Sequence, residues 1–397
     1  MTHDDRPEDA GTPEPDRESG QLRPTRRGLL QGALGGAIGF AAGAGSGAAV
    51  VSGTAATPAA RPGAGRPQPV PASGCYQAGI HLPASPQLFG RIAVLEIGGS
   101  TLGWLAALGR RVIQLTEDGD GEILPDGPGD LTISVGIGPR LVRAADPTII
   151  GTTDLPAFAG DEGITPGHVG GDVLLAVHSS DPTVLAAVVD DLALLIPEST
   201  RQWEQATFRG AGVGTKARNT LGFMDGVIVP RTSDELDRGV WVTSGPLAGG
   251  TVCVIRRLAI DTTRFRTLDI GEREGVIGRT LTDGAPLSGG GPDDQIDLNS
   301  KTPEGEFIVP AHAHARAAHP SFTGSELMLR RSYSYDNGVD SGLVFISFQN
   351  DLRTFVATQQ RLDEMDALMK FTRPTASGTF LVLPGFDAVT PLGAAFG

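Results

Sequence analysis

Three of the seven histidines and two adjacent arginines lie close together in the sequence: His312, His314, His319, Arg330 and Arg331. A neutral imidazole can ligate a metal ion or haem iron, and a fixed cation can stabilise developing negative charge. Three interpretations are open. The histidines are surface residues; or His312 and His314, which share one face if the segment is a strand, bind zinc or copper; or one histidine is an axial haem ligand.

A second stretch offers a carboxylate in an apolar setting. Asp225 stands between Gly222 and Gly226, with Phe223 and Ile228 among its apolar neighbours. Asp-Gly alone indicates only a turn. A carboxylate surrounded by apolar side chains is partly desolvated, however, and such a group is suited to proton transfer.

These two stretches together resemble the dye-decolourising peroxidase family. RNTLGFMDG is similar to the family's Gly-x-x-Asp-Gly signature, AHARAAHP to its proximal-histidine segment, and LMLRRSYSY to its distal-arginine strand. Further motifs follow in family order: YQAGI (76–80), LTISVGIGPRLV (131–142), GDVLLAVHSSDP (171–182), GLVFISFQNDL (342–352) and FVATQQRLDEMDAL (355–368). The resemblance covers roughly residues 75–397 and is greatest to the exported branch that includes deferrochelatase/peroxidases.

The resemblance implies a haem b site. His314 would be the axial ligand, by its place in Ala-His-x-Arg-x-x-x-Pro. Asp225 would be the distal acid–base group and Arg330 the distal cation, with Gly222 and Gly226 beside the cofactor. The resemblance therefore assigns catalysis to the stretch that contains Asp225 and the stretch that contains His314 and Arg330.

The supporting residues are less fixed by the sequence. Arg316 and Arg331 are expected to meet the haem propionates, with solvation as the alternative. An axial histidine donates its second N–H to a carboxylate or carbonyl. Asp351 is the expected partner of His314, and a helix N-cap is its alternative role. His312 and His319 are left as surface or supporting residues.

We therefore expect an exported haem b peroxidase that reduces hydrogen peroxide and oxidises dyes, phenols or other small organic donors through a ferryl intermediate. One alternative is a haem-binding or iron-acquisition protein of the deferrochelatase kind with incidental peroxidase activity. Another is a copper or zinc protein built on the histidines. A homo-oligomer is left open.

Composition excludes some partners. The net charge of −14 argues against nucleic acid, whose phosphates attract basic surfaces. Two cysteines, Cys75 and Cys253, permit at most one disulfide and lack metal-binding spacing.

The N-terminal segment, residues 1–60, is expected to be a Tat signal peptide with a disordered acidic start. Arg26-Arg27 precedes a run rich in Gly and Ala, which is only weakly apolar. A permanent anchor is the alternative, but a membrane-spanning helix needs about 20 strongly apolar residues. We expect no stable membrane span after cleavage, and a location outside the cell, in the cell wall or in the periplasm.

The elements that must position the site are expected to form an α+β fold. A Pro- and Gly-rich linker (61–74) precedes two ferredoxin-like βαββαβ domains, 75–210 and 211–397, with haem in the second. The first half predicts strands at 91–97, 131–136, 172–177 and 203–208, with helices at 102–115 and from an Asp181 N-cap to 195. The second predicts strands at 250–260, 326–334, 342–349 and 378–383, with helices at 262–274 and 352–369.

Overall fold

The computed structural model describes residues 67–396. The predicted signal peptide and the first part of the linker lie outside these residues. Among the helices that are described, none combines the length and the apolar character that crossing a membrane requires.

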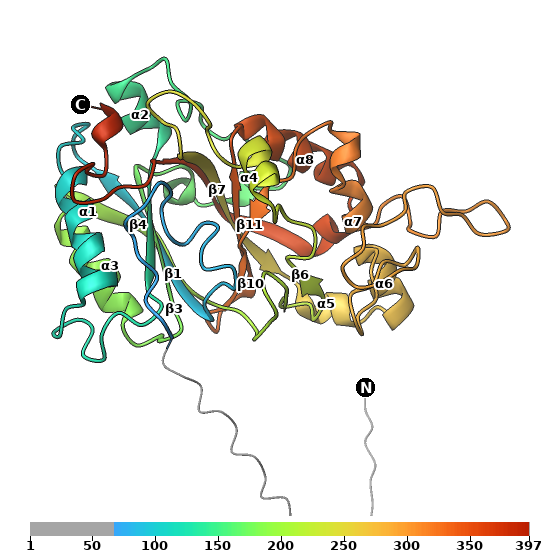
Figure 1. The fold of residues 1–397 in the computed structure, drawn as a ribbon. Helices are drawn as coiled ribbons and strands as arrows, with labels where there is room; N and C mark the ends of the chain where they lie inside the picture. Colours follow the sequence, from blue (N-terminus) through green and yellow to red (C-terminus); the bar gives the residue numbers. More distant parts are fainter. Residues whose placement is uncertain (1–66, 397) are drawn as a thin grey trace, which may run out of the picture. The chain divides into compact units, whose positions relative to one another are not determined.

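The first half forms four antiparallel strands in the order β2-β3-β1-β4. The strands are β1 (Phe89–Ile97), β2 (Thr132–Ile137), β3 (Val173–Ser179) and β4 (Ser199–Phe208). Helices α1 (Leu105–Ile113) and α3 (Leu185–Leu194) lie beside these strands (Figure 1). Their buried apolar residues pack into the same core as those of the strands. This order and these crossovers are those of a ferredoxin-like unit. A short helix, α2 (Pro139–Ala145), follows β2.

The second half repeats the arrangement in the order β11-β7-β10-β9. Its strands are β7 (Thr251–Ile260), β8 (Leu329–Arg330), β9 (Tyr333–Asp336), β10 (Ser341–Gln349) and β11 (Thr372–Val382). Its helices are α4 (Ser233–Gly239), α5 (Thr262–Arg266), α6 (Ile270–Ile277), α7 (His314–Ala317) and α8 (Leu352–Met365). The predicted pair of ferredoxin-like halves is confirmed, while the exact boundary between them stays a prediction.

The two halves share one nine-stranded sheet. β11 pairs with β2 at one junction, β4 pairs with β9 at the other, and β7 pairs with β10. The pairings therefore close into a ring. Side chains alternate across such a sheet: Ile92 and Val94 of β1 point to an interior core shared by both halves, while Ala93 and Leu95 meet the helices.

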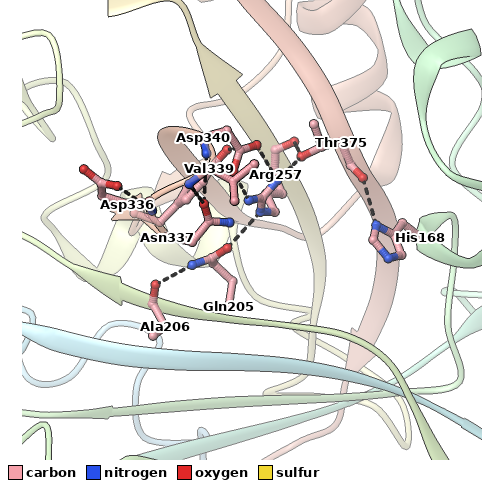
Figure 2. A network of polar contacts seen from close by, with 11 residues as sticks. His168, Gln205, Ala206, Arg257, Asp336, Asn337, Val339, Asp340 and Thr375 are labelled. Carbon is pink, nitrogen blue, oxygen red and sulfur yellow. Dashed lines mark hydrogen bonds and ion pairs between the residues drawn. The ribbon is translucent and has the colours of Figure 1, made fainter.

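One polar network links strands of the second half to β4 of the first, and Figure 2 shows it from close by. Arg257 of β7 donates to both carboxylate oxygens of Asp340, at 2.6 and 3.0 Å. It also donates to Gln205 of β4 and Thr375 of β11, at 2.9 and 2.6 Å, and lies 4.1 Å from the ring centroid of Tyr335. One partly buried guanidinium thus joins three strands to the turn between β9 and β10.

Several predicted boundaries were wrong for local reasons. The helix expected to begin at Asp181 begins at Leu185, because Asp181 accepts hydrogen bonds from the amide and hydroxyl of Thr183 and forms a turn instead. The helix expected to reach 369 ends at Met365, which is 40% exposed. The helix expected at 262–274 is split into α5 and α6, and the strand expected at 326–334 into β8 and β9.

Candidate active site

The second half contains a cavity of about 440 Å³ between α7, α8, β7, β8 and β10. Its walls are largely apolar and include Phe223, Leu258, Ile277, Met328, Phe345 and Leu362. His314, Asp225 and Arg330 line this same cavity. The fold therefore brings Asp225, which is remote in sequence, to His314 and Arg330 in a space of ligand size, and each of the three has a chemical role expected from its motif.

His314 opens the short helix α7 and is held by a carboxylate. Its Nδ1 lies 2.6 Å from Oδ2 of Asp366, a fully buried side chain. Burial would lower the pKa of His314, but the neighbouring Asp366 outweighs that effect and raises the pKa above its usual value. Because Nδ1 is engaged, Nε2 is the nitrogen available to a ligand in the cavity.

The expected partner of His314, Asp351, was the wrong carboxylate. Asp351 caps α8 by accepting the amide of Arg353 at 2.9 Å, and its side chain pairs with the Arg353 guanidinium. Asp366 lies at the other end of that helix. An acidic residue is unfavourable at a helix C-terminus, where the dipole is negative. Asp363 and Glu364 share this position in the sequence, so the feature does not single out Asp366.

Asp225 sits on β6 (Met224–Asp225), which pairs with β5 (Ala217–Arg218). Its Oδ1 accepts the amide of Gly226 at 2.6 Å. Gly226 has a φ of +72°, and a Cβ there would lie 2.1 Å from the carbonyl oxygen of Thr215. Only glycine fits such a position, so the backbone that carries Asp225 is closely confined.

Arg330 reaches the same cavity from β8. Its Nη2 donates to the carbonyl oxygen of Ile228 at 3.0 Å, three residues beyond Asp225 in the chain. This bond ties the arginine to the segment that carries the carboxylate. The pair thus combines a proton acceptor with a fixed positive charge.

The other two arginines expected at the cofactor do not line this cavity. Arg316 donates to the carbonyl oxygen of Leu298 and stacks 4.1 Å from the ring centroid of Phe307. Arg331 is buried outside this cavity and donates to the carbonyl oxygen of Pro83. Their positions give no support to the propionate contacts expected from the sequence.

Two cavity residues were missed or left undecided by the sequence. Arg279 lines the cavity, and burial lowers the pKa of its guanidinium; nothing in its local sequence marks it. His319 also lines the cavity, with its Nε2 3.3 Å from Oε1 of Gln295. His312 is exposed and does not line the cavity.

These residues fit haem better than a simple metal ion. Within residues 67–396, no group of three or more His, Cys, Asp or Glu side chains could hold a metal ion. The separation of His312 from His314 also removes the basis of the zinc or copper interpretation. A single histidine, oriented by a carboxylate inside an apolar cavity, is the donor set of an axial haem ligand.

Comparisons with known proteins agree with this chemistry. The family profile described as Dyp-type peroxidase, C-terminal, matches residues 216–387. A curated dye-decolorizing peroxidase from Thermobifida fusca is 35% identical over 283 residues, 64% of this chain and 65% of the relative. A deferrochelatase from Yersinia pestis is 30% identical over 293 residues, 66% of this chain and 65% of the relative. The matches thus span slightly less than two thirds of these curated relatives.

Solved structures match over a larger share. A DyP-type peroxidase from Cellulomonas bogoriensis is 31% identical, with a TM-score of 0.75 over 83% of this chain and 98% of that one. Ferric DtpA from Streptomyces lividans is 29% identical, with the same TM-score over 83% of this chain and 96% of that one. The similarity therefore includes both halves of the sheet.

Proposed function

The chain belongs to the DyP-type peroxidase family, and we propose that it is a haem-dependent peroxidase that reduces hydrogen peroxide and oxidises small organic donors. The observation that carries this proposal is the meeting of His314, Asp225 and Arg330 in one cavity, with Asp366 behind the histidine. Haem would supply the redox chemistry when bound.

Each side chain has a separate task. His314 would hold the iron through Nε2, while Asp366 would accept a hydrogen bond from Nδ1–H, fix the ring and make the ligand more basic. Asp225 would take the proton of the entering peroxide as a general base. Arg330 would stabilise the negative charge that develops as the O–O bond breaks, since a guanidinium stays protonated.

The positions of the two cysteines agree with a haem b that is held without covalent bonds to the protein. Cys75 is exposed and Cys253 lies buried inside the sheet, both as free thiols, and neither lines the cavity. Dyes and phenols are the donors that we propose. The oxidised haem intermediate expected from the sequence stays a prediction.

The test is peroxide-dependent oxidation of a phenol by the haem-loaded protein. Asp225→Asn should lower kcat/KM for peroxide by about 10²–10⁴-fold, the usual contribution of a positioned general base, while haem binding is retained. Asp351→Asn is the matched control and should keep the native rate. An Asp225→Asn protein that reacts at the native rate would remove Asp225 from the proposed role.

A second candidate follows from the relative named deferrochelatase, which is 30% identical. In that case the chain would take iron out of haem, and peroxidase activity would be incidental. Incubation with haem distinguishes the two functions. Iron-free porphyrin would accumulate under the alternative, whereas a peroxidase retains intact haem and turns over the phenol.

We also propose that the protein is exported by the Tat pathway. The support is the Arg26-Arg27 pair before an uncharged Gly- and Ala-rich run, all outside the described residues. Changing both arginines to lysine should leave the protein in the cytoplasm in a fractionation experiment. Undiminished export of that variant would contradict the proposal.

A further inference from the structure

A second, much smaller cavity of about 20 Å³ lies next to the distal pair. Asp225 and Arg330 line both cavities, and the small one is completed by Arg209, Arg331 and Ser332 among others. Several arginines thus surround the small cavity, and Asp225 is the single carboxylate in its lining. This imbalance of charge requires an explanation.

Arg331 is the most deeply buried of these arginines, with 5% of its surface exposed. Its Nη1 donates to the carbonyl oxygen of Pro83 at 2.9 Å, but its Nη2 is buried without a partner. Burial lowers the pKa of Arg331 to about 10, so the group remains charged at neutral pH. Within residues 67–396 it forms no ion pair with a carboxylate.

Arg209 adds a second, half-buried charge. Its Nη2 donates to the carbonyl oxygen of Thr215 at 3.0 Å, and its guanidinium lies 5.9 Å from the ring centroid of Tyr333. Burial lowers the pKa of Arg209, and its proximity lowers the pKa of Arg331 as well. Like Arg331, Arg209 forms no ion pair with any carboxylate in the described part of the chain.

Of the neighbouring titratable side chains, Asp225 acts on Arg209 and offsets part of its charge, and the others add no negative charge beside Arg331. Burial lowers the pKa of His178, which stacks on Tyr333, to about 3, and raises the pKa of Tyr333. Both are therefore neutral near pH 7. Asp130, which acts on Tyr333 from farther away, is engaged by the amide and hydroxyl of Ser180.

We propose that the small cavity binds one monovalent anion of halide size, such as chloride, between Arg209 and Arg331. A water molecule could accept a hydrogen bond from Nη2, but it would leave the buried charge of Arg331 without a counter-ion, and Asp225 offsets only part of the charge of Arg209. A cavity needs about 10–15 Å³ to hold one water-sized group. The small cavity, at about 20 Å³, is therefore too small for phosphate or an organic carboxylate. The weakly hydrated guanidinium suits an anion in a buried site.

The site goes beyond the peroxidase function and does not depend on it. The anion would sit next to Asp225 and Arg330 without contacting the iron ligand, because His314 lines only the larger cavity. A halide site could therefore exist even if the proposed peroxidase activity were absent. Failure of one proposal would leave the other open to its own test.

The test uses the full haem-loaded protein and bromide as the probe. Crystals grown in sodium bromide should show an anomalous peak between Arg209 and Arg331. In solution, replacing gluconate by bromide at constant ionic strength should raise the Tm by about 2–4 °C once bromide is roughly ten times its Kd. Arg209→Gln and Arg331→Met should each abolish this rise, and two variants are used in case one fails to fold.

Arg110→Gln is the matched control, because Arg110 is exposed on α1, and it should keep the full response. The Soret band is recorded in parallel. A native protein with no anomalous peak and equal Tm in both salts would overturn the proposal. Bromide could instead bind the iron. In that case the Soret band would shift with bromide and the rise in Tm would persist in both arginine variants, and this result would also overturn the proposal.

Discussion

His314 and Asp366 show how a residue acquires its role from a neighbour that is remote in sequence. They are 52 positions apart, yet Nδ1 and Oδ2 are 2.6 Å from each other. Asp366 also accepts the amide of Leu368 at 2.8 Å, so one carboxylate both orients the histidine and begins the next turn. The carboxylate is therefore held from two sides.

The charge of Asp366 should tune the haem. Asp366→Asn keeps an acceptor for Leu368 but removes the negative charge behind His314, so the ligand becomes less basic. We expect the reduction potential of the iron to rise and haem affinity to fall, on the order of 10–100-fold, as for other residues that support a metal ligand. Spectroelectrochemistry and haem transfer to apomyoglobin measure the two effects.

Asp351→Asn is the control for that prediction, because Asp351 caps α8 and does not touch His314. It should leave the potential unchanged. Equal shifts in the two variants would mean that the Asp366 effect is not transmitted through the histidine.

Residues inside local motifs could be found from the sequence, and residues that join the site through the tertiary fold could not. His314, Asp225 and Arg330 each stand in a motif that resembles one of the family's motifs, and that resemblance gave their roles. Asp366 and Arg279 reach the site only because α8 and α6 pack around it. Asp351 was misassigned because the sequence does not show that Asp366, rather than Asp351, lies beside His314. Asp351 instead accepts the amide of Arg353 at the start of α8.

At the scale of elements, the β5–β6 hairpin is the part that fixes the distal carboxylate. Ala217 pairs with Asp225, and the Thr215 hydroxyl donates to the carbonyl oxygen of Gly226 at 2.8 Å. The hairpin was missed by hydrophobic periodicity because each strand has only two residues. Periodicity needs a longer segment to be visible.

Gly226→Ala tests how tightly this hairpin is confined. A positive φ costs a non-glycine residue roughly 1–2 kcal/mol, and the new Cβ would also meet the Thr215 oxygen at 2.1 Å. Gly222→Ala shares the positive φ, at +88°, but its Cβ would meet nothing closer than 3.5 Å. Urea unfolding should therefore show a clearly larger loss of stability for Gly226→Ala, and equal losses would contradict the close approach.

At the scale of the whole described fold, the two halves depend on strand pairings that cross between them. β11 meets β2 in two register pairs and β4 meets β9 in one, so the junctions are short. The order of elements within each half was predictable from alternating strands and helices. The pairings between halves were not, since neither junction has a sequence signal.

The Arg257–Asp340 pair should contribute pH-dependent stability. Burial would raise the pKa of Asp340, but the Arg257 hydrogen bonds and charge outweigh burial and lower it. The stabilisation is therefore present above the unfolded pKa of about 3.9 and lost as pH falls through the lower folded pKa. Asp340→Asn should cost about 1.5–3 kcal/mol at pH 7, the range for a charged hydrogen bond.

Unfolding midpoints measured between pH 7 and pH 3 check this prediction. The difference between the native protein and Asp340→Asn should stay constant down to about pH 4 and shrink below it. Asp336→Asn, in the same hairpin and exposed, should behave as the native protein does (Figure 2). A difference that is independent of pH would mean that the charge of Asp340 is not what stabilises the turn.

The identity of the axial ligand is the central claim, and a haem titration followed at the Soret band tests it most directly. The native protein and His312→Ala should bind haem with the same affinity and the same spectrum, because His312 is exposed and does not line the cavity. His314→Ala should lose haem or show a different coordination spectrum. Normal haem binding by His314→Ala, or its loss in His312→Ala alone, would contradict the assignment of the site.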